Sequence, residues 1–110
     1  LMGPGNNQLR GQSAYAMLHP RLAGRIDYPE VAALAAPKPA LFIAGSEDGL
    51  FPVPSVEAAF RVLDTAWREA GAKEALTTRL RAGGHAFTLE DQAVALDLLD
   101  KALKGCSAVP

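Results

Sequence analysis

An α/β fold with parallel strands is predicted by the order of the elements along this chain of 110 residues. Residues 40–44 (ALFIA) are a short, continuously apolar run, which is typical of a strand covered on both faces. An amphipathic helical segment follows at 54–71, a second strand-like segment at 74–81 and a final helical segment at 88–105. A connection of this length between two strands forms a right-handed crossover, so the two strands are expected to be parallel.

The helix at 54–71 is predicted from its capping residues and its apolar periodicity. Ser55 is the expected N-cap, and Gly71 is expected to end the helix. Between them, apolar residues recur at three- and four-residue steps, which is the spacing of one helix face. The residues in this stripe are Val56, Ala59, Phe60, Leu63, Ala66, Trp67 and Ala70.

Two further helices are indicated by their N-terminal signals. In the final helix, at 88–105, Thr88 and Asp91 have the spacing of a capping box. Before the first strand, Asp27 is a suitable cap for a short helix, and Pro29 suits the first turn of such a helix because its missing N–H has no partner there anyway.

Residues 27–105 are expected to form one α/β segment, preceded by an arm or a remnant of an upstream segment at 1–26 and followed by a tail at 106–110. A domain of this size buries roughly 65 % of its unfolded surface. Two parallel strands and two helices, however, cannot cover both faces of an apolar strand or protect both edges of the sheet. The sheet is therefore expected to be completed by missing residues or by another chain, so that a homo-oligomer or a missing N-terminal half is predicted.

Composition and charge argue against several classes of partner. The chain carries 11 basic and 12 acidic residues, without a block of basic residues, which argues against binding to nucleic acid or to an anionic membrane surface. No apolar run has the length of ~18–20 residues that a membrane span needs. The sequence begins with Leu1 and shows no signal-peptide layout, so the compartment stays open. The single cysteine, Cys106, cannot form an internal disulfide, and no Cys/His spacing matches a structural zinc site.

Two titratable residues follow the two predicted strands. Asp48 lies four residues after the first strand and His85 about four residues after the second. Because the carboxyl ends of adjacent parallel strands meet at one edge of the sheet, we expect the two side chains within hydrogen-bonding reach. A carboxylate that orients an imidazole is the arrangement of a general base. Gly83 and Gly84 beside His85, and Gly49 beside Asp48, are expected to provide backbone freedom and space for a substrate. Two simpler interpretations remain open, in which Asp48 only stabilises a turn and His85 is only an exposed loop residue.

The linked pattern of these segments resembles a known enzyme group. The stretches DYPEVAALAAPKPALFIAGSEDGLFPV, VEAAFRVLDTAWREAGA and RAGGHAFT are similar to the C-terminal part of α/β-hydrolases of the dienelactone-hydrolase-like and acetyl-xylan-esterase-like group, over roughly residues 27–104. The resemblance implies that Asp48 is the acid and His85 the base of a catalytic triad. It also implies that Phe51 and Phe87 line the pocket, although both are equally compatible with a place in the core.

The nucleophile of that group lies upstream of the similar segment, on a G-x-S-x-G turn between a strand and a helix. These 110 residues contain no such motif. Ser13, in GQSAY, has one of the two glycines, but no apolar strand precedes it. The other serines are Ser46 in the acid loop, Ser55 at the expected helix cap and Ser107 in the tail. No upstream loop offers the backbone donors of an oxyanion hole.

The leading functional hypothesis is therefore a C-terminal segment of a serine or cysteine ester hydrolase, which supplies Asp48 and His85 and is not active alone. The substrate class is a small carboxylic ester, and neither a metal nor an organic cofactor is implied. The alternative is a non-catalytic half-fold that acts as an oligomerisation or assembly module through its open strand edge and apolar faces. A metal site formed by Asp48, His85 and His19 has little support, because no ligand spacing links the three residues.

Overall fold

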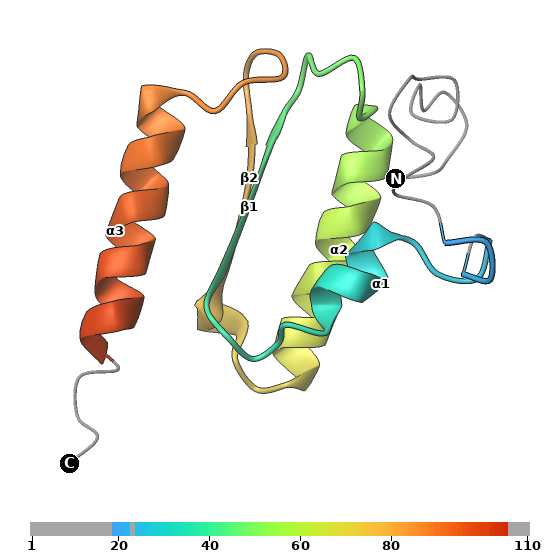
Figure 1. The fold of residues 1–110 in the computed structure, drawn as a ribbon. Helices are drawn as coiled ribbons and strands as arrows, with labels where there is room; N and C mark the ends of the chain where they lie inside the picture. Colours follow the sequence, from blue (N-terminus) through green and yellow to red (C-terminus); the bar gives the residue numbers. More distant parts are fainter. Residues whose placement is uncertain (1–18, 23, 106–110) are drawn as a thin grey trace.

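The computed structural model describes residues 19–22 and 24–105, and within them the predicted order of elements is confirmed. The chain runs through a short helix and a strand, then a long helix, a single 3₁₀ turn, a second strand and a second long helix (Figure 1). Most of the predicted arm and the whole tail lie outside the described residues. The bounds are α1 Tyr28–Ala33, β1 Ala40–Gly45, α2 Val53–Glu69, η3 Lys73–Ala75, β2 Leu76–Arg81 and α3 Leu89–Gly105.

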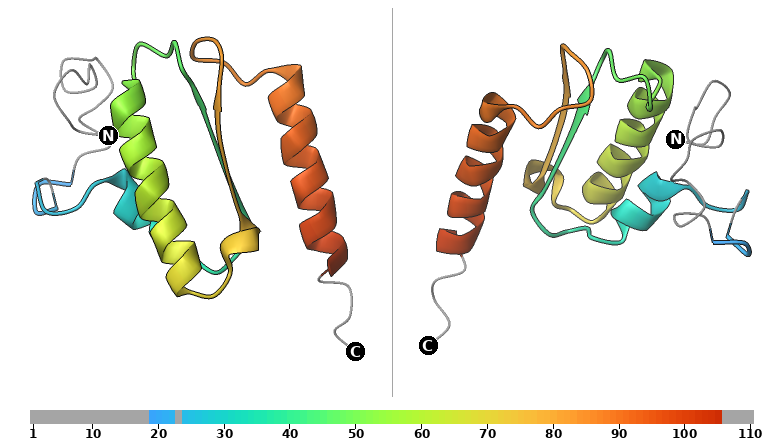
Figure 2. Two further views of the ribbon diagram at one scale, coloured as in Figure 1. Left: turned by 180° about the vertical axis from the view of Figure 1, so that it is seen from behind. Right: turned by 45° about the horizontal axis from the view of Figure 1, so that its top comes forward.

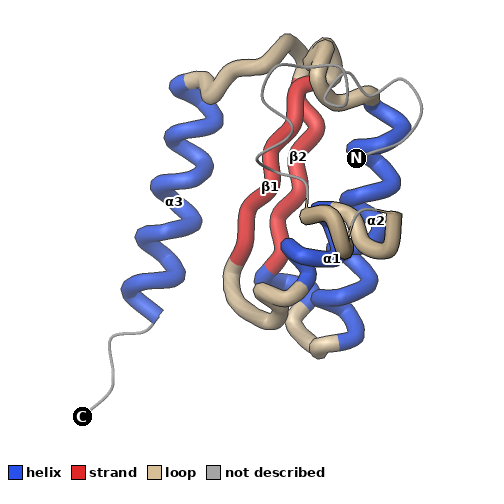
Figure 3. The backbone as a smooth tube through the Cα atoms, turned by 45° about the vertical axis from the view of Figure 1, so that its right-hand side comes forward, coloured by secondary structure: helices blue, strands red, loops and turns tan. Residues whose placement is uncertain are grey.

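The two strands form a parallel sheet, as predicted, and they pair in register from Ala40 opposite Leu76 to Gly45 opposite Arg81. The views in Figure 2 show α1 and α2 on one side of this sheet and α3 on the other. Figure 3 shows the same three layers from the side of α2, with both strands between the helices. The described residues thus form a mixed α/β arrangement with helices on both faces of the sheet, but of the strand residues only Gly45 is buried, so the cover is incomplete.

The core lies between α2 and the sheet. The buried residues of α2 are one face of the predicted stripe, at three- and four-residue steps: Val56, Ala59, Leu63 and Trp67. The indole of Trp67 is fully buried and donates from Nε1 to the carbonyl oxygen of Lys38 at 2.9 Å. It also packs edge-to-face on Phe42 of β1, with ring centroids 6.3 Å apart. Since Lys38 and Phe42 flank the start of β1, this one side chain fixes α2 against the strand.

The prediction that Ser55 caps α2 is wrong. The helix begins at Val53, the N-cap position is Pro52, and no side chain caps the first turn. Prolines explain the earlier start, because Pro54 presets a helical φ and its missing N–H has no partner in a first turn. The carbonyl of Pro52 accepts the N–H of Ser55 at 2.9 Å, so Ser55 lies inside the helix rather than at its boundary.

The other predicted helix signals are confirmed by hydrogen bonds. Gly71 follows α2 with a φ of +70°, and its N–H donates to the carbonyl of Arg68, a pattern that ends helices in a left-handed turn. Asp27 caps α1 in a capping box with Glu30. At α3, the N–H of Asp91 donates to Oγ1 of Thr88 at 3.1 Å and the N–H of Thr88 donates to Oδ2 of Asp91 at 3.0 Å.

The second strand is shorter than the predicted 74–81. Lys73–Ala75 form a 3₁₀ turn, and the strand begins at Leu76. The register explains the difference, because Ala40, the first residue of β1, already pairs with Leu76. The residue before it, Pro39, has no N–H with which to extend the ladder. The preceding residues close their own hydrogen bonds in the turn instead, with the N–H of Ala75 on the carbonyl of Ala72 at 2.9 Å.

Helix α3 carries apolar residues on two faces. One face, which includes Ala95 and Leu98, lines the grooves beside β1 and β2. At 3.6 residues per turn, a second stripe lies roughly 120° around the helix from the first. Its exposed side chains are Leu89, Leu96 and Leu103, whereas Leu99, which is also exposed, lines the groove beside β1. A helix that is apolar well beyond one stripe is normally covered on both sides. Within the described residues, no helix is both long enough and apolar enough to cross a lipid bilayer.

We expect the exposed stripe of α3 to drive association of the chain. The thermal unfolding midpoint should rise with protein concentration over about a hundredfold range, because association stabilises the folded state by mass action. Replacing two stripe residues, Leu96→Gln with Leu103→Gln, should remove most of this dependence. Asp100→Asn on the same helix, which removes only an exposed ion pair with Lys104, should retain it. A cooperative melt of the unchanged chain that is independent of concentration would contradict the expectation.

Candidate acid–base site

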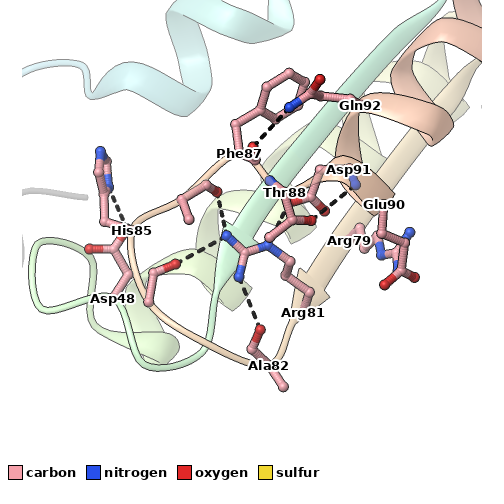
Figure 4. Close-up of polar contacts among 12 residues, drawn as sticks. Asp48, Arg79, Arg81, Ala82, His85, Phe87, Thr88, Glu90, Asp91 and Gln92 are labelled. Carbon is pink, nitrogen blue, oxygen red and sulfur yellow. Dashed lines mark hydrogen bonds and ion pairs between the residues drawn. The ribbon is translucent and has the colours of Figure 1, made fainter.

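The structure brings Asp48 and His85 together, as predicted. Nδ1 of His85 lies 2.8 Å from Oδ2 of Asp48 (Figure 4). A carboxylate has no proton to donate, so this contact with an ionised Asp48 requires the proton on Nδ1 of the ring. The Asp48 side chain is 5 % exposed whereas that of His85 is 69 % exposed. The carboxylate is therefore held inside the molecule, and the other ring nitrogen, Nε2, points away from it (Figure 4).

The two oxygens of Asp48 have separate contacts. Oδ2 accepts from the imidazole, while Oδ1 accepts the N–H of Leu50 at 2.9 Å. The N–H of Asp48 is 3.3 Å from the carbonyl of Gly45, and its carbonyl accepts the N–H of Phe51 at 3.3 Å. The turn-stabilising role and the pairing with His85 are thus combined in one side chain. The turn fixes the carboxylate, and the fixed carboxylate orients the ring.

The acid loop and the histidine loop are joined by backbone hydrogen bonds beyond the strand ends. The N–H of Ser46 donates to the carbonyl of Arg81 at 2.8 Å, and the N–H of Glu47 donates to the carbonyl of Gly83 at 3.0 Å. Gly45 makes this approach possible. A Cβ at that position would lie 2.4 Å from the carbonyl oxygen of Gly83 and 2.5 Å from that of Gly84. No other residue fits there without moving the two loops apart.

The prediction of unusual backbone angles at the loop glycines is correct at one position and wrong at two, while the predicted space for a substrate stays a prediction. Gly83 has a φ of +103°, a conformation that other residues rarely adopt. Gly84 and Gly49 do not have positive φ, so neither supplies the predicted backbone freedom. The close approach instead depends on Gly45, which the sequence reading treated only as the end of a strand. A glycine ending an apolar strand next to a functional loop was the available signal.

Arg81, which was not predicted from the sequence, holds the histidine loop (residues 82–88) through hydrogen bonds to its backbone. Arg81 is the last residue of β2, and its guanidinium contacts the carbonyl oxygens of Ala82 at 3.0 Å, Gly84 at 3.1 Å and Ala86. Its Nε donates to Oδ2 of Asp91 at 2.6 Å, and Figure 4 shows the hydrogen bonds of this guanidinium. The side chain of Arg81 is 11 % exposed, and its bond to Asp91 is the more buried part of this set, whereas the three contacts with the loop carbonyls lie at the surface.

Asp91 is fully buried, and its charge is nevertheless favoured. Burial raises the pKa of its carboxyl, but hydrogen bonds from Thr88 and the guanidinium of Arg81 together lower the pKa below its ordinary value of 3.8. Asp91 therefore loses its proton at a lower pH in the folded protein than in the unfolded chain.

A pocket of about 450 Å³ opens beside the pair. Asp48 and His85 contribute to its wall together with Phe51 and Phe87, as the resemblance implied. Arg81 lines it as well. The volume falls within the range of about 300–1,000 Å³ that is usual for small-molecule sites. A largely apolar pocket with one oriented imidazole at its wall suits a small, uncharged substrate.

The remaining candidate residues do not join the site. Nδ1 of His19 accepts the N–H of Arg21, and the described residues contain no group of three or more His, Cys, Asp or Glu side chains that could hold a metal. Within that part of the chain, no hydroxyl group is hydrogen-bonded to His85. Ser13, Ser107 and Cys106 lie outside the described residues.

Comparisons of the chain with models of known protein families, with curated proteins and with solved structures found no match. The resemblance described above therefore remains a prediction that depends on the quoted segments. The geometry of the site is the independent observation from which a function can be argued.

We expect Gly45→Ala to separate the two loops. The added methyl overlaps two backbone carbonyls, so it should lower the free energy of unfolding by about 1–3 kcal/mol, as other overpacked sites do. Gly49→Ala is the matched control in the same loop, because nothing lies within 4 Å of a Cβ there. It should be neutral or stabilising by up to about 1 kcal/mol. Urea unfolding followed by Trp67 fluorescence measures both, and equal effects would show that the close approach is absent.

We expect Asp91 to make stability depend on pH on the acid side. Its folded pKa lies below its unfolded value, so the stabilisation is fully present above about pH 5 and is lost as pH falls through the folded pKa. Asp91→Asn should be less stable than the unchanged chain at pH 7 and should lose less stability on acidification. Urea unfolding at a series of pH values tests this. An unchanged slope in the variant would contradict the lowered pKa.

Proposed function

We propose that this chain supplies the acid and the general base of a serine or cysteine hydrolase that acts on small carboxylic esters. The observation that carries the proposal is the 2.8 Å contact between a buried Asp48 carboxylate and an exposed His85 imidazole. This is the arrangement by which a carboxylate fixes the tautomer of a histidine and leaves Nε2 able to accept a proton. The position of both residues just past the carboxyl ends of adjacent parallel strands supports the same function.

In the proposed reaction, the nucleophile is a hydroxyl or thiol group from outside the described residues. Nε2 of His85 takes its proton as its oxygen or sulfur forms a bond to the ester carbonyl carbon. Asp48 stabilises the imidazolium that results. The tetrahedral intermediate then collapses, the bond to the leaving alcohol breaks, and Nε2 returns the proton to that alcohol. Water repeats the same steps on the acyl-enzyme and releases the acid.

The pocket supports the choice of substrate class. Its wall combines Phe51 and Phe87 with the acid–base pair, and this suits an apolar acyl or alcohol group of modest size. The chemistry needs no redox step, and an oriented histidine suffices for the proton transfers. No cofactor is therefore part of the proposal.

We predict that the 110-residue chain alone does not hydrolyse an activated short-chain aryl ester, and that the polypeptide obtained by following the reading frame upstream of Leu1 does. In that longer polypeptide, His85→Ala should reduce kcat/KM by about 10²–10⁴-fold, the usual contribution of a general base. Asp48→Asn should also reduce it, because the ring would lose its fixed tautomer. His19→Ala is the matched control and should have no effect, because His19 lies in a separate turn.

Labelling with a fluorophosphonate probe for a serine and with iodoacetamide for a cysteine, followed by peptide mapping, identifies the nucleophile in the same samples. Stoichiometric labelling that is slowed by His85→Ala supports the proposal. Equal activity in the unchanged polypeptide and in His85→Ala would overturn it, as would hydrolysis that requires neither Asp48 nor His85.

The alternative function, an assembly module, is favoured by one specific observation. Leu96 and Leu103 lie on a second apolar face of α3 that the described residues leave exposed. In this alternative, α3 and the open edge of the sheet bind another chain, and the pair of Asp48 and His85 has no substrate. The two functions differ in the labelling experiment, because an assembly module gives association through α3 without labelling by the probe.

A further inference from the structure

We propose that Arg81 and Asp91 together position the imidazole of His85 so that it forms its hydrogen bond with Asp48. The inference depends on the proposed function for its catalytic meaning, although its geometry can be tested without activity. Neither residue belongs to the acid–base pair. Both act through the backbone of the loop that carries His85.

The contacts of Arg81 bracket His85 along the chain. Its guanidinium binds the carbonyl oxygens of Ala82 and Gly84, which precede the histidine, and of Ala86, which follows it (Figure 4). Arginine is the residue suited to this task because its planar group carries five donors in a fixed fork. Without these contacts the loop would have a wider choice of conformations at Gly83, which has a φ of +103°.

Asp91 ties this arginine to the end of α3. Oδ2 of Asp91 accepts both from Nε of Arg81 and from the N–H of Thr88, so one atom holds the guanidinium and caps the helix. Asp91 is fully buried, and its other oxygen, Oδ1, has no hydrogen-bond partner among the described residues. A buried ion pair gives little net stability compared with apolar packing. The pair of Arg81 and Asp91 is therefore better explained by its role in fixing the loop that carries His85 than by a contribution to stability.

The fixed loop matters because, apart from the contact with Asp48 and the backbone bond between Glu47 and Gly83, little holds the ring of His85 in place. The side chain of His85 is 69 % exposed, so packing does not hold the ring in place. A displacement of about 1 Å at a catalytic group is enough to reduce the rate about 10²-fold. An exposed catalytic ring therefore requires an ordered backbone beneath it, and Arg81 provides that order.

The chain contains a matched control for this positioning role. Arg79 lies two residues earlier on the same strand and pairs with Glu90 in the same turn of α3. Unlike Arg81, it binds no carbonyl of the histidine loop in the described residues. Removing Arg79 therefore deletes a strand-to-helix ion pair of the same chemical type and leaves the loop contacts intact.

The experiment measures the tautomer of His85 in the full chain by long-range ¹H–¹⁵N correlation, in alkaline buffer where histidine rings are neutral. His19→Ala assigns the ring signals, because the chain has only two histidines. The unchanged chain and Arg79→Met should hold the Nδ1–H tautomer. Arg81→Met should shift the tautomer ratio at least about tenfold toward the Nε2–H form, as expected when a charge-assisted hydrogen bond is lost. Asp48→Asn gives the reference for a broken pair.

Arg81→Lys provides the second variant. It retains the positive charge beside Asp91 but not the fork, so its tautomer ratio should resemble that of Arg81→Met. Circular dichroism and Trp67 fluorescence establish that each variant is folded. Where Arg81→Met does not fold, Arg81→Lys decides the result.

The outcomes separate this inference from the proposed function. If the unchanged chain holds the Nδ1–H tautomer and Arg81→Met and Arg81→Lys hold it equally, the positioning role is overturned while the acid–base pair stands. If both Arg81 variants unfold, the role is also overturned, because the pair is then a requirement of the whole fold. If the unchanged chain lacks the Nδ1–H tautomer, the geometry behind both proposals fails.

Discussion

The in-register parallel pairing of β1 with β2 is the constraint on which the rest of the structure depends. Gly45 pairs with Arg81, so both strands end at the same level and their following loops lie side by side. Two further backbone hydrogen bonds then join the loops, and the absence of a side chain at Gly45 leaves room for them. A shift of the register by one residue would turn each side chain of one strand to the opposite face. It would also move Asp48 out of reach of His85.

The same pairing separates two kinds of electrostatic environment at the strand ends. On one side, Asp48 divides its oxygens between its own turn and an exposed imidazole. On the other side, Arg81 and Asp91 pair with side chains that are 11 % and 0 % exposed, and Arg81 also binds backbone carbonyls of the histidine loop at the surface. In the proposed function, the exposed imidazole of His85 exchanges a proton with a ligand, whereas the pair of Arg81 and Asp91 orders the chain. A site that needs both movement of a proton and a fixed geometry gains from this separation.

Sequence reasoning predicted what depends on local signals and missed what depends on contacts across the chain. Element order, the parallel strands, the capping box at Asp91 and the meeting of Asp48 with His85 follow from periodicity, capping spacing and topology. Ser55 was misplaced because two prolines start the helix earlier than a side-chain cap would. The role of Arg81 was not predictable, because its contacts with the loop become apparent only when β2 and α3 are placed together.

An acid–base pair gains catalytic value only from a nucleophile within its reach, and this bears on the exposed surfaces of the chain. General-base assistance contributes about 10²–10⁴-fold, but only in a transition state that contains the group being deprotonated. A chain that covers the leucines of α3 would therefore stabilise the fold without supplying a nucleophile. The proposed reaction requires a hydroxyl or thiol at Nε2 of His85, at the carboxyl ends of the strands. A strand added in parallel to the open edge of β1 would end at that level, whereas a partner on the outer face of α3 alone would not. The chemistry thus depends on which surface of this chain is covered, and association by itself does not decide its function.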